Sequence, residues 1–319
     1  MKAKITGIAH YLPERIINNE ELSARYQTIS SERILLRTGI KERRYSEDLT
    51  TAGMAVKAIY HLLEKTKTAA NEIDCILIGT LTPDYFFPST AVVVIKEIGA
   101  QNAFGYDVVA ACPSFMYALE QAQMMIQSGK AKKIIVCGAD RMSRTINSFD
   151  HKTGVLFGDA AGAVLIEAYP DDVKGINTCK SIVKADNIKD VYYATPFIVD
   201  NWYANKFELN GPQVYQHGVG LTADFLSDFF QKNNLKFTDF KYIVPHQSNL
   251  NMMIDVAEKL EIPFDMFLAN IETRGNTAGA SVPLCLSEKV DEGVVKNGDR
   301  LLLVSFGAGY TLSLADVYF

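Results

Sequence analysis

The sequence predicts an α/β protein built from two similar halves. Apolar segments of strand length alternate with longer segments in which apolar residues recur at helical spacing, as in layered α/β proteins. This order is repeated along the chain: Tyr242 follows Ile76 by 166 positions, and Arg300 follows Lys133 by 167. Segments of one type at nearly one offset indicate two copies of an α/β unit.

Length, composition and charge narrow the class of protein. The chain has 319 residues, enough for two fused units, and we divide it into halves 1–170 and 171–319. Its 48% hydrophobic and 22% charged residues are typical of a globular protein, and a net charge of −5 argues against a nucleic-acid partner. The five cysteines lack CxxC or metal-ligand spacing, which fits a reducing compartment and no bound metal. With no signal peptide or membrane span in the sequence, we expect a cytoplasmic protein.

The elements of the first half follow from apolar periodicity. Strands are expected at 3–9, 73–79, 106–111, 132–140 and 157–167, and helices from Asn19, at 50–65 and at 115–126. Segment 91–98 is apolar throughout, and periodicity alone leaves both helix and strand open. Segment 33–45 is rich in arginine, and its charge favours a solvated loop.

The second half repeats the alternation. Helices are expected at 220–232, 250–260 and 282–290, and strands at 242–247, 299–309 and 310–319. Segment 171–210 is polar and irregular, and it is interpreted as a linker with an inserted cap.

Cys112 lies where the strand 106–111 meets the helix 115–126. Pro113 suits the first turn of a helix, so Cys112 is expected at the helix N-terminus. There, free N–H groups and the helix dipole favour the thiolate, which is the nucleophilic form. A free cysteine is also commonly a small buried hydrophobe, so this joint alone leaves both interpretations open.

Two further residues stand at matching places. His246 follows a strand in the motif Pro245-His-Gln-Ser-Asn, and Asn276 lies in the turn Gly275-Asn-Thr. Strand ends and glycine-rich turns are where active sites of α/β proteins gather. Taken singly, His246 fits a core histidine and Asn276 an ordinary turn residue, so the set of three residues carries the hypothesis of an active site.

Together these motifs resemble the β-ketoacyl-acyl carrier protein synthase III family of thiolase-fold condensing enzymes. The resemblance covers nearly the whole chain. Seven motifs occur in order: Arg37-Thr-Gly-Ile with Glu42-Arg-Arg, Phe87-Pro-Ser, Asp107–Phe115, Phe157-Gly-Asp-Ala-Ala-Gly-Ala, Pro245-His-Gln-Ser-Asn, Gly275-Asn-Thr and Ser305-Phe-Gly-Ala-Gly. The resemblance implies a thiolase-like fold with αβαβα layers. It also implies decarboxylative Claisen condensation of an acyl thioester with a malonyl thioester, such as malonyl-acyl carrier protein.

The resemblance implies roles for individual residues. Cys112 would accept the acyl group, and the backbone N–H groups of Cys112 and Ala308 would form an oxyanion hole. His246 and Asn276 would donate to the malonyl thioester carbonyl while CO2 leaves. No cofactor is implied, because thioesters of coenzyme A or acyl carrier protein are the substrates. The implied acyl pocket comprises Phe87, Phe157, Leu209 and Phe306. The implied entrance for coenzyme A or the carrier comprises Arg33, Arg37, His151, Asn210, Gly211 and Asn249.

Several positions depart from the family pattern. Arg33 and His151 stand where the family often holds adenine between Trp and Arg. The basic carrier-docking positions are Gln216, Asn251 and Glu258 here, with Lys259 kept, so the patch facing an acidic carrier is weaker. These changes suggest a specialised member of the family.

Three functional hypotheses and two further expectations follow. Besides the condensing enzyme, a ketosynthase-like enzyme or acyltransferase of a secondary pathway stays open. A non-catalytic partner subunit is disfavoured, because it would not need all three of Cys112, His246 and Asn276.

The resemblance also implies a homodimer in which Phe87 reaches into the partner's acyl pocket. The bulky residues of the implied pocket favour short acyl donors.

Overall fold

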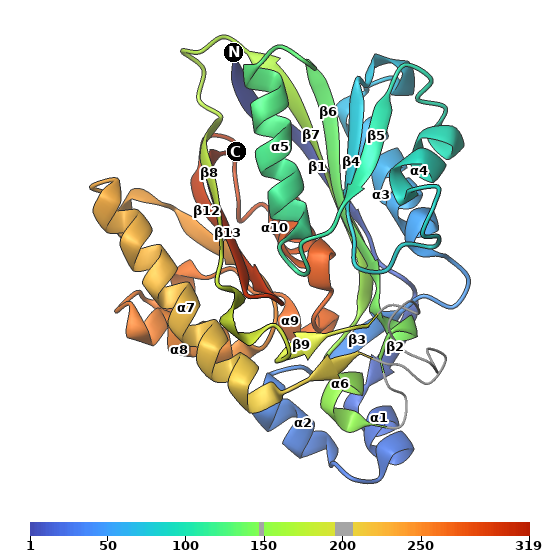
Figure 1. The fold of residues 1–319 in the computed structure, drawn as a ribbon, viewed down its shortest axis with the longest axis vertical. Helices are drawn as coiled ribbons and strands as arrows, with labels where there is room; N and C mark the ends of the chain where they lie inside the picture. The colour runs from blue at the N-terminus through green and yellow to red at the C-terminus, as the bar shows by residue number, and fades with distance from the viewer. Residues whose placement is uncertain (147–149, 195–206) are drawn as a thin grey trace.

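The computed structural model describes residues 1–146, 150–194 and 207–319, and two mixed β-sheets form its core (Figure 1). The N-terminal sheet has the order β1-β7-β6-β4-β5. Its strands are β1 (Lys2–Tyr11), β4 (Cys75–Gly79), β5 (Phe104–Val108), β6 (Lys133–Arg141) and β7 (Asp159–Tyr169). The C-terminal sheet has the order β11-β12-β13-β8. Its strands are β8 (Ile176–Val183), β11 (Tyr242–Pro245), β12 (Arg300–Gly307) and β13 (Thr311–Tyr318).

The two sheets share one topology. In the N-terminal sheet, β7 is antiparallel to β1 and β6, and β6 is parallel to β4. In the C-terminal sheet, β13 is antiparallel to β8 and β12, and β12 is parallel to β11. The starts of β4 and β11 differ by 242 − 75 = 167 positions, and those of β6 and β12 by 300 − 133 = 167. The prediction of two similar halves is confirmed, while their division at residues 170 and 171 stays a proposal.

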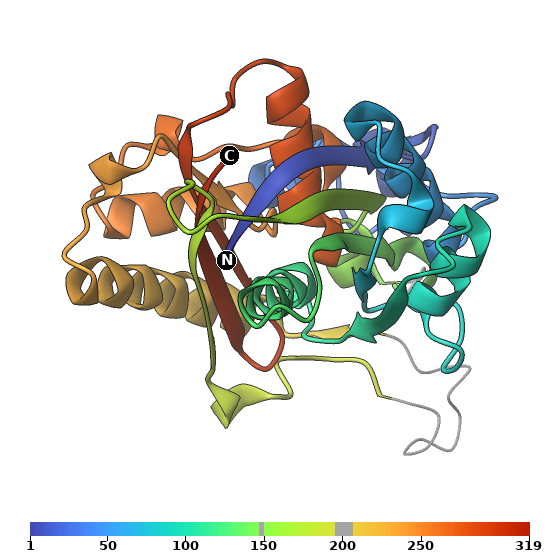
Figure 2. The same ribbon diagram turned by 90° about the horizontal axis from the view of Figure 1, so that it is seen from above.

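Helices complete a sandwich of five layers (Figures 1 and 2). Helices α5 and α10 lie between the sheets, in an apolar cluster that contains residues of both sheets. Helices α3 and α4 cover the outer face of the N-terminal sheet, and α7 and α8 cover that of the C-terminal sheet. Their bounds are α3 (Thr51–Thr66), α4 (Thr90–Ile98), α5 (Ser114–Gln127), α7 (Gly211–Lys232), α8 (Leu250–Lys259) and α10 (Ser281–Asp291). This is the predicted αβαβα architecture.

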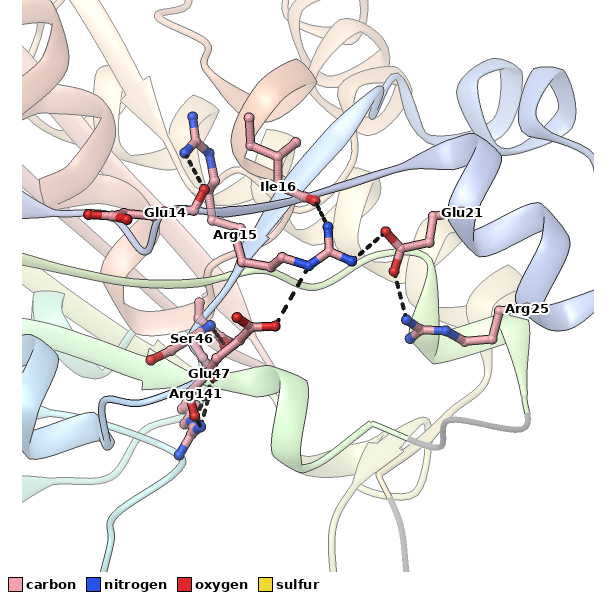
Figure 3. A network of polar contacts seen from close by, with 10 residues as sticks. Glu14, Arg15, Ile16, Glu21, Arg25, Ser46, Glu47 and Arg141 are labelled. Carbon is pink, nitrogen blue, oxygen red and sulfur yellow. Dashed lines mark hydrogen bonds and ion pairs between the residues drawn. The ribbon is translucent and has the colours of Figure 1, made fainter.

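Smaller elements surround one end of the sandwich, at the bottom of Figure 1. They are β2 (Arg15–Asn18), β3 (Glu42–Tyr45), β9 (Val191–Tyr192), β10 (Glu208–Leu209), α1 (Asn19–Tyr26), α2 (Ser31–Thr38) and α6 (His151–Gly154), and α9 (Ile271–Arg274) lies above them. Figure 3 shows how polar contacts join this region: Arg15 pairs with Glu21 and Glu47, and Arg141 donates to the carbonyl of Ser46. Because these ion pairs are solvent-exposed, each contributes only about 0–1 kcal/mol.

The charge of the arginine-rich segment 33–45 suggested a solvated loop. The structure corrects this prediction. It contains most of α2 and all of β3, and Arg43 is fully buried. The Arg43 guanidinium donates to the carbonyls of Ile17 and Val155 and to Asn19 Oδ1. The charge of the segment did not predict this burial, because a charged side chain can be buried where enough hydrogen-bond acceptors surround it.

Three further expectations need correction or completion. Segment 171–210 is more than a linker and cap, because β8 within it is an edge strand of the C-terminal sheet. Helix α7 begins nine residues before the predicted Gly220, at Gly211, where Pro212 fits the first turn. Segment 91–98 is the helix α4, and the Asp107 carboxylate accepts the N–H groups of Thr90 and Ala91 at its start. That contact explains the single charge in the otherwise apolar β5.

Candidate active site

A cavity of about 960 Å³ is lined by residues of both halves, including Cys112, His246 and Asn276. Cys112 follows β5, His246 follows β11, and Asn276 lies in the turn after α9. The three residues predicted from separate motifs therefore meet at one cavity. It is lined mainly by apolar side chains with a few polar groups, as is usual for ligand sites.

Cys112 occupies a tight turn between β5 and α5. Ala111 has a left-handed backbone with φ 54°, and Pro113 precedes the first residue of α5. Burial raises the pKa of the Cys112 thiol to about 12, and the Asp140 carboxylate adds to the increase. This contradicts the expectation of a resident thiolate. Loss of hydration outweighs the helix N-terminus here, so the free thiol is protonated.

His246 is held as a buried, neutral imidazole. The backbone N–H of His246 donates to the Val304 carbonyl at 2.7 Å, and the ring atom Nδ1 lies 2.6 Å from Ser281 Oγ. The Phe306 ring packs edge-on against the imidazole, with 5.7 Å between ring centroids. Burial lowers the pKa of His246 to about 3, so the ring stays uncharged around neutral pH.

Asn276 is fixed by backbone pairing with the segment before β7. Its N–H donates to the Leu156 carbonyl, and its own carbonyl accepts from Gly158, both at 2.9 Å. Its Oδ1 accepts the N–H of Ala278 at 2.9 Å. Because a backbone N–H can only donate, the side-chain amide is oriented with its NH2 group as the remaining donor. Asn276 thus fits the role of a hydrogen-bond donor toward a ligand.

Gly307 packs closely against the backbone of Cys112. A Cβ at Gly307 would lie 2.9 Å from the Cys112 nitrogen, so only glycine allows this close approach. Ala308 follows Gly307 and lines the same cavity. Among the described residues, no protein group accepts the N–H of Cys112 or of Ala308. Both groups are available for the predicted oxyanion hole.

The predicted acyl pocket is only partly formed within one chain. Phe157, Leu209 and Phe306 line the cavity, whereas Phe87 lies outside it and is 87% exposed. Sequence reasoning missed Phe207, which also lines the cavity and packs edge-on against Phe157 at 5.2 Å. Phe207 lies in the segment interpreted as linker and cap, where no motif marked it.

Most predicted entrance residues also reach the cavity. Arg37, His151, Asn210, Gly211 and Asn249 line it, and Asn249 donates to the Arg37 carbonyl. Arg33 does not: it is an exposed residue of α2 outside the cavity lining. Of the two arginines on α2 that were expected at the entrance, only Arg37 therefore lies at the cavity.

The described residues offer neither a cluster of metal ligands nor a membrane-spanning helix. In residues 1–146, 150–194 and 207–319, no three or more His, Cys, Asp or Glu side chains are grouped to hold a metal. Within the same residues, every helix is too short or too polar to span a bilayer.

Known proteins resemble the chain over its full length. Residues 106–189 match the family model of 3-oxoacyl-[acyl-carrier-protein] synthase III, and residues 230–317 match the model of its C-terminal part. The chain is 37% identical to a β-ketoacyl-[acyl-carrier-protein] synthase III of Clostridium perfringens (strain SM101 / Type A), with 98% of each chain covered. It is 39% identical to the enzyme of that name from Chlorobium chlorochromatii, with 98% of this chain and 97% of the relative covered.

Solved structures give the same assignment. The 3-oxoacyl-[acyl-carrier-protein] synthase III of Aquifex aeolicus superposes with a TM-score of 0.93 at 33% identity, covering 99% of this chain and all of that one. The priming β-ketosynthase of the R1128 polyketide pathway also gives 0.93, at 29% identity over 99% and 96% of the two chains. The chain belongs to the 3-oxoacyl-[acyl-carrier-protein] synthase III family.

Proposed function

We propose that this protein condenses an acyl thioester with a malonyl thioester, with loss of CO2, through an acyl-Cys112 intermediate. The observation that carries the proposal is the meeting of a cysteine thiol with two neutral hydrogen-bond donors, His246 and Asn276, at one cavity. A simple acyltransferase needs a nucleophile and a base, whereas decarboxylation calls for donors directed at a developing enolate.

In the first half-reaction, the Cys112 sulfur attacks the carbonyl of the donor thioester. The N–H groups of Cys112 and Ala308 stabilise the tetrahedral oxyanion. Because burial keeps the thiol protonated, its proton must leave as the new C–S bond forms. The departing thiolate of the donor takes up that proton, so the products are the acyl-enzyme and a free thiol.

In the second half-reaction, the malonyl thioester loses its carboxylate as CO2. The electron pair of the broken C–C bond forms an enolate, whose oxygen accepts hydrogen bonds from His246 and Asn276. Removing a single donor of this kind typically costs about 10²–10³ in rate. The α-carbon then attacks the acyl-Cys112 carbonyl, the C–S bond breaks, and the Cys112 thiolate takes up a proton from solvent.

The bulk of the side chains that line the cavity favours short acyl donors such as acetyl or small branched groups. Phe157, Phe207 and Phe306 line the same cavity as Cys112, and their bulk would limit the room for an acyl chain beside the thiol. A longer chain gains about 0.8 kcal/mol per buried methylene, but overpacking a tight site costs roughly 1–3 kcal/mol.

We assign the donor to an acyl-CoA and the extender to malonyl-acyl carrier protein. A secondary-pathway ketosynthase is the second candidate function, because one structural relative is a priming ketosynthase of a polyketide pathway.

A homodimer that resides in the cytoplasm completes the proposal. Strand β5 ends the N-terminal sheet, and exposed apolar residues lie on or near it: Tyr85, Phe87, Val92, Phe104 and Val109. Pairing two copies at this edge would cover these side chains and bring Phe87 to the partner's cavity. Light scattering at micromolar concentration tests this proposal, because a monomer contradicts it.

Intact-protein mass spectrometry tests the donor. The protein is incubated with acetyl-, butyryl-, octanoyl- and dodecanoyl-CoA, and the rate of the mass increase at Cys112 is compared with that of Phe87→Thr. We expect fast acylation by the short donors, with longer donors gaining in Phe87→Thr. Faster acylation of the unmodified protein by long donors, unchanged in Phe87→Thr, contradicts a short pocket. Adding malonyl-CoA or malonyl-acyl carrier protein then identifies the extender.

A further inference from the structure

The hydroxyl of Ser281 makes a short hydrogen bond to the ring of His246. Ser281 is the first residue of α10, and its Oγ lies 2.6 Å from His246 Nδ1. Both residues are buried, with exposed fractions of 1% and 3%. The bond joins a helix of the central layer to a residue that lines the cavity, so it can control which ring nitrogen of His246 carries the proton.

The surrounding hydrogen bonds give the direction of this one. Ser281 Oγ also accepts the backbone N–H of Gln247 at 3.4 Å, and that group can only donate. Among the described residues, His246 Nδ1 is the only acceptor within reach of the Ser281 hydroxyl proton. The hydroxyl therefore donates to a bare Nδ1. A neutral imidazole with a bare Nδ1 carries its proton on Nε2.

The other half of the molecule supplies an internal comparison. At an offset of 167 positions, Ser281 corresponds to Ser114 and His246 corresponds to Gly79. A Cβ at Gly79 would lie 2.6 Å from the Phe115 nitrogen, so that half has no room for a histidine. Ser114 Oγ is buried and lacks a hydrogen-bond partner among the described residues. The same serine thus has a hydrogen-bond partner only in the half that holds the imidazole.

We propose that Ser281 is a positioning residue that holds His246 in the Nε2–H form, with this N–H available to the malonyl thioester carbonyl. The role in decarboxylation rests on the proposed function, whereas the protonation of the ring nitrogens does not. The other form, with the proton on Nδ1, would present a lone pair to the enolate oxygen and repel it.

Two matched variants separate this role from simple packing. Ser281→Ala removes the hydroxyl, and Ser281→Thr keeps it. Ser287→Ala is the control, because Ser287 lies on the same helix and its Oγ is 2.8 Å from Nδ1 of His10, which is outside the cavity lining. Thermal unfolding confirms that each variant is folded before activity is compared.

The main readout is malonyl decarboxylation by protein already acylated at Cys112. We expect Ser281→Ala to slow it by about tenfold or more, by analogy with the loss seen when the hydrogen-bond partner of a metal-bound histidine is removed. Acylation of Cys112 should stay unchanged, and Ser281→Thr and Ser287→Ala should decarboxylate like the unmodified protein. Unaltered decarboxylation by folded Ser281→Ala overturns the proposal.

Nitrogen-15 NMR of histidine-labelled protein gives a readout independent of activity. The unmodified protein should show His246 with a bare Nδ1 and a protonated Nε2, and Ser281→Ala should shift this distribution. A protonated Nδ1 in the unmodified protein overturns the proposal. If the unmodified protein fails to decarboxylate malonyl thioesters, the proposed function is wrong, but the NMR result still decides the role of Ser281.

Discussion

The turns that lead into α5 and α10 each contain an alanine with a left-handed backbone, but their environments differ. In the first, Ala111 has φ 54° and precedes Cys112; in the second, Ala278 has φ 48° and precedes Gly279. The turns are 278 − 111 = 167 positions apart, the offset of the sheets themselves. The N–H of Gly279 donates to Asp140 Oδ2 at 2.8 Å, whereas the N–H of Cys112 has no acceptor among the described residues.

The different environments of the two turns follow from one sequence difference between the two halves. Asp140 lies at the end of β6, and the corresponding position in β12 is Gly307, since 307 − 140 = 167. Asp140 therefore supplies an acceptor to one turn, whereas Gly307 has no side chain to supply one to the other. Such a backbone turn is suited to bind an anion, and the Asp140 carboxylate binds at the turn of Gly279, which has no nucleophile.

Loss of the nucleophile should have the largest effect. Cys112→Ala removes the only group of the proposed mechanism that bonds covalently to the acyl chain, so no acyl-enzyme should form. Intact-protein mass spectrometry after incubation with acetyl-CoA measures the adduct. Cys285→Ala is the control, because Cys285 is buried on α10, and this variant should still be acylated. An acyl adduct on Cys112→Ala would assign the nucleophile elsewhere.

Removal of one donor should affect only the second half-reaction. His246→Ala or Asn276→Ala should lower malonyl decarboxylation by about 10²–10³, because each donor faces the developing enolate. Acylation of Cys112 should persist, because its oxyanion is held by backbone N–H groups. Release of CO2 from malonyl-CoA and the adduct mass are measured in parallel. Equal loss of both half-reactions would contradict the division of roles between the two halves.

A side chain at Gly307 should impair acylation itself. In Gly307→Ala, the new Cβ would lie 2.5 Å from Pro113 Cδ and 2.9 Å from the Cys112 nitrogen, so the backbone must shift. We expect acylation to fall by about 10², the scale of losing one oxyanion donor. Gly220→Ala is the matched control, because its Cβ meets nothing within 4 Å. Normal acylation of Gly307→Ala would show that the close approach of Gly307 to Cys112 is not needed for the oxyanion site.

The sequence carried enough information for the layers and for the three central residues. Periodicity and the 167-residue offset are local patterns, and Cys112, His246 and Asn276 each lie in a motif at a strand end or turn. The charge state of Cys112 could not be predicted, because it depends on burial and on Asp140, which is 140 − 112 = 28 positions away in sequence. Burial of Arg43 and the position of Phe207 likewise depend on partners distant in the chain.

The comparison of the turns also predicts a pH dependence of stability, the smallest expected effect. Burial raises the pKa of Asp140 to about 6, although N–H groups of Leu81 and Gly279 oppose the increase. An unfolded carboxyl group has a pKa of about 3.9, so between about pH 4 and 6 the folded state binds a proton that the unfolded state does not. This group therefore makes the free energy of unfolding decrease as pH rises through that window.

A tenfold change in an acid dissociation constant corresponds to about 1.4 kcal/mol. The decrease in the free energy of unfolding is therefore at most about 3 kcal/mol, and it is complete above about pH 6.

Asp140→Asn cannot titrate, and its free energy of unfolding should lack this decrease. We expect the difference in unfolding free energy between the unmodified protein and Asp140→Asn to change with pH only in this window, as measured by urea unfolding at a series of pH values. A difference that is constant with pH would mean that Asp140 is ionised throughout, held by its four hydrogen-bonded groups on Thr80, Leu81, Thr82 and Gly279. In that case the carboxylate fills the second turn as a full anion, which would strengthen the likeness to a bound oxyanion beside Cys112.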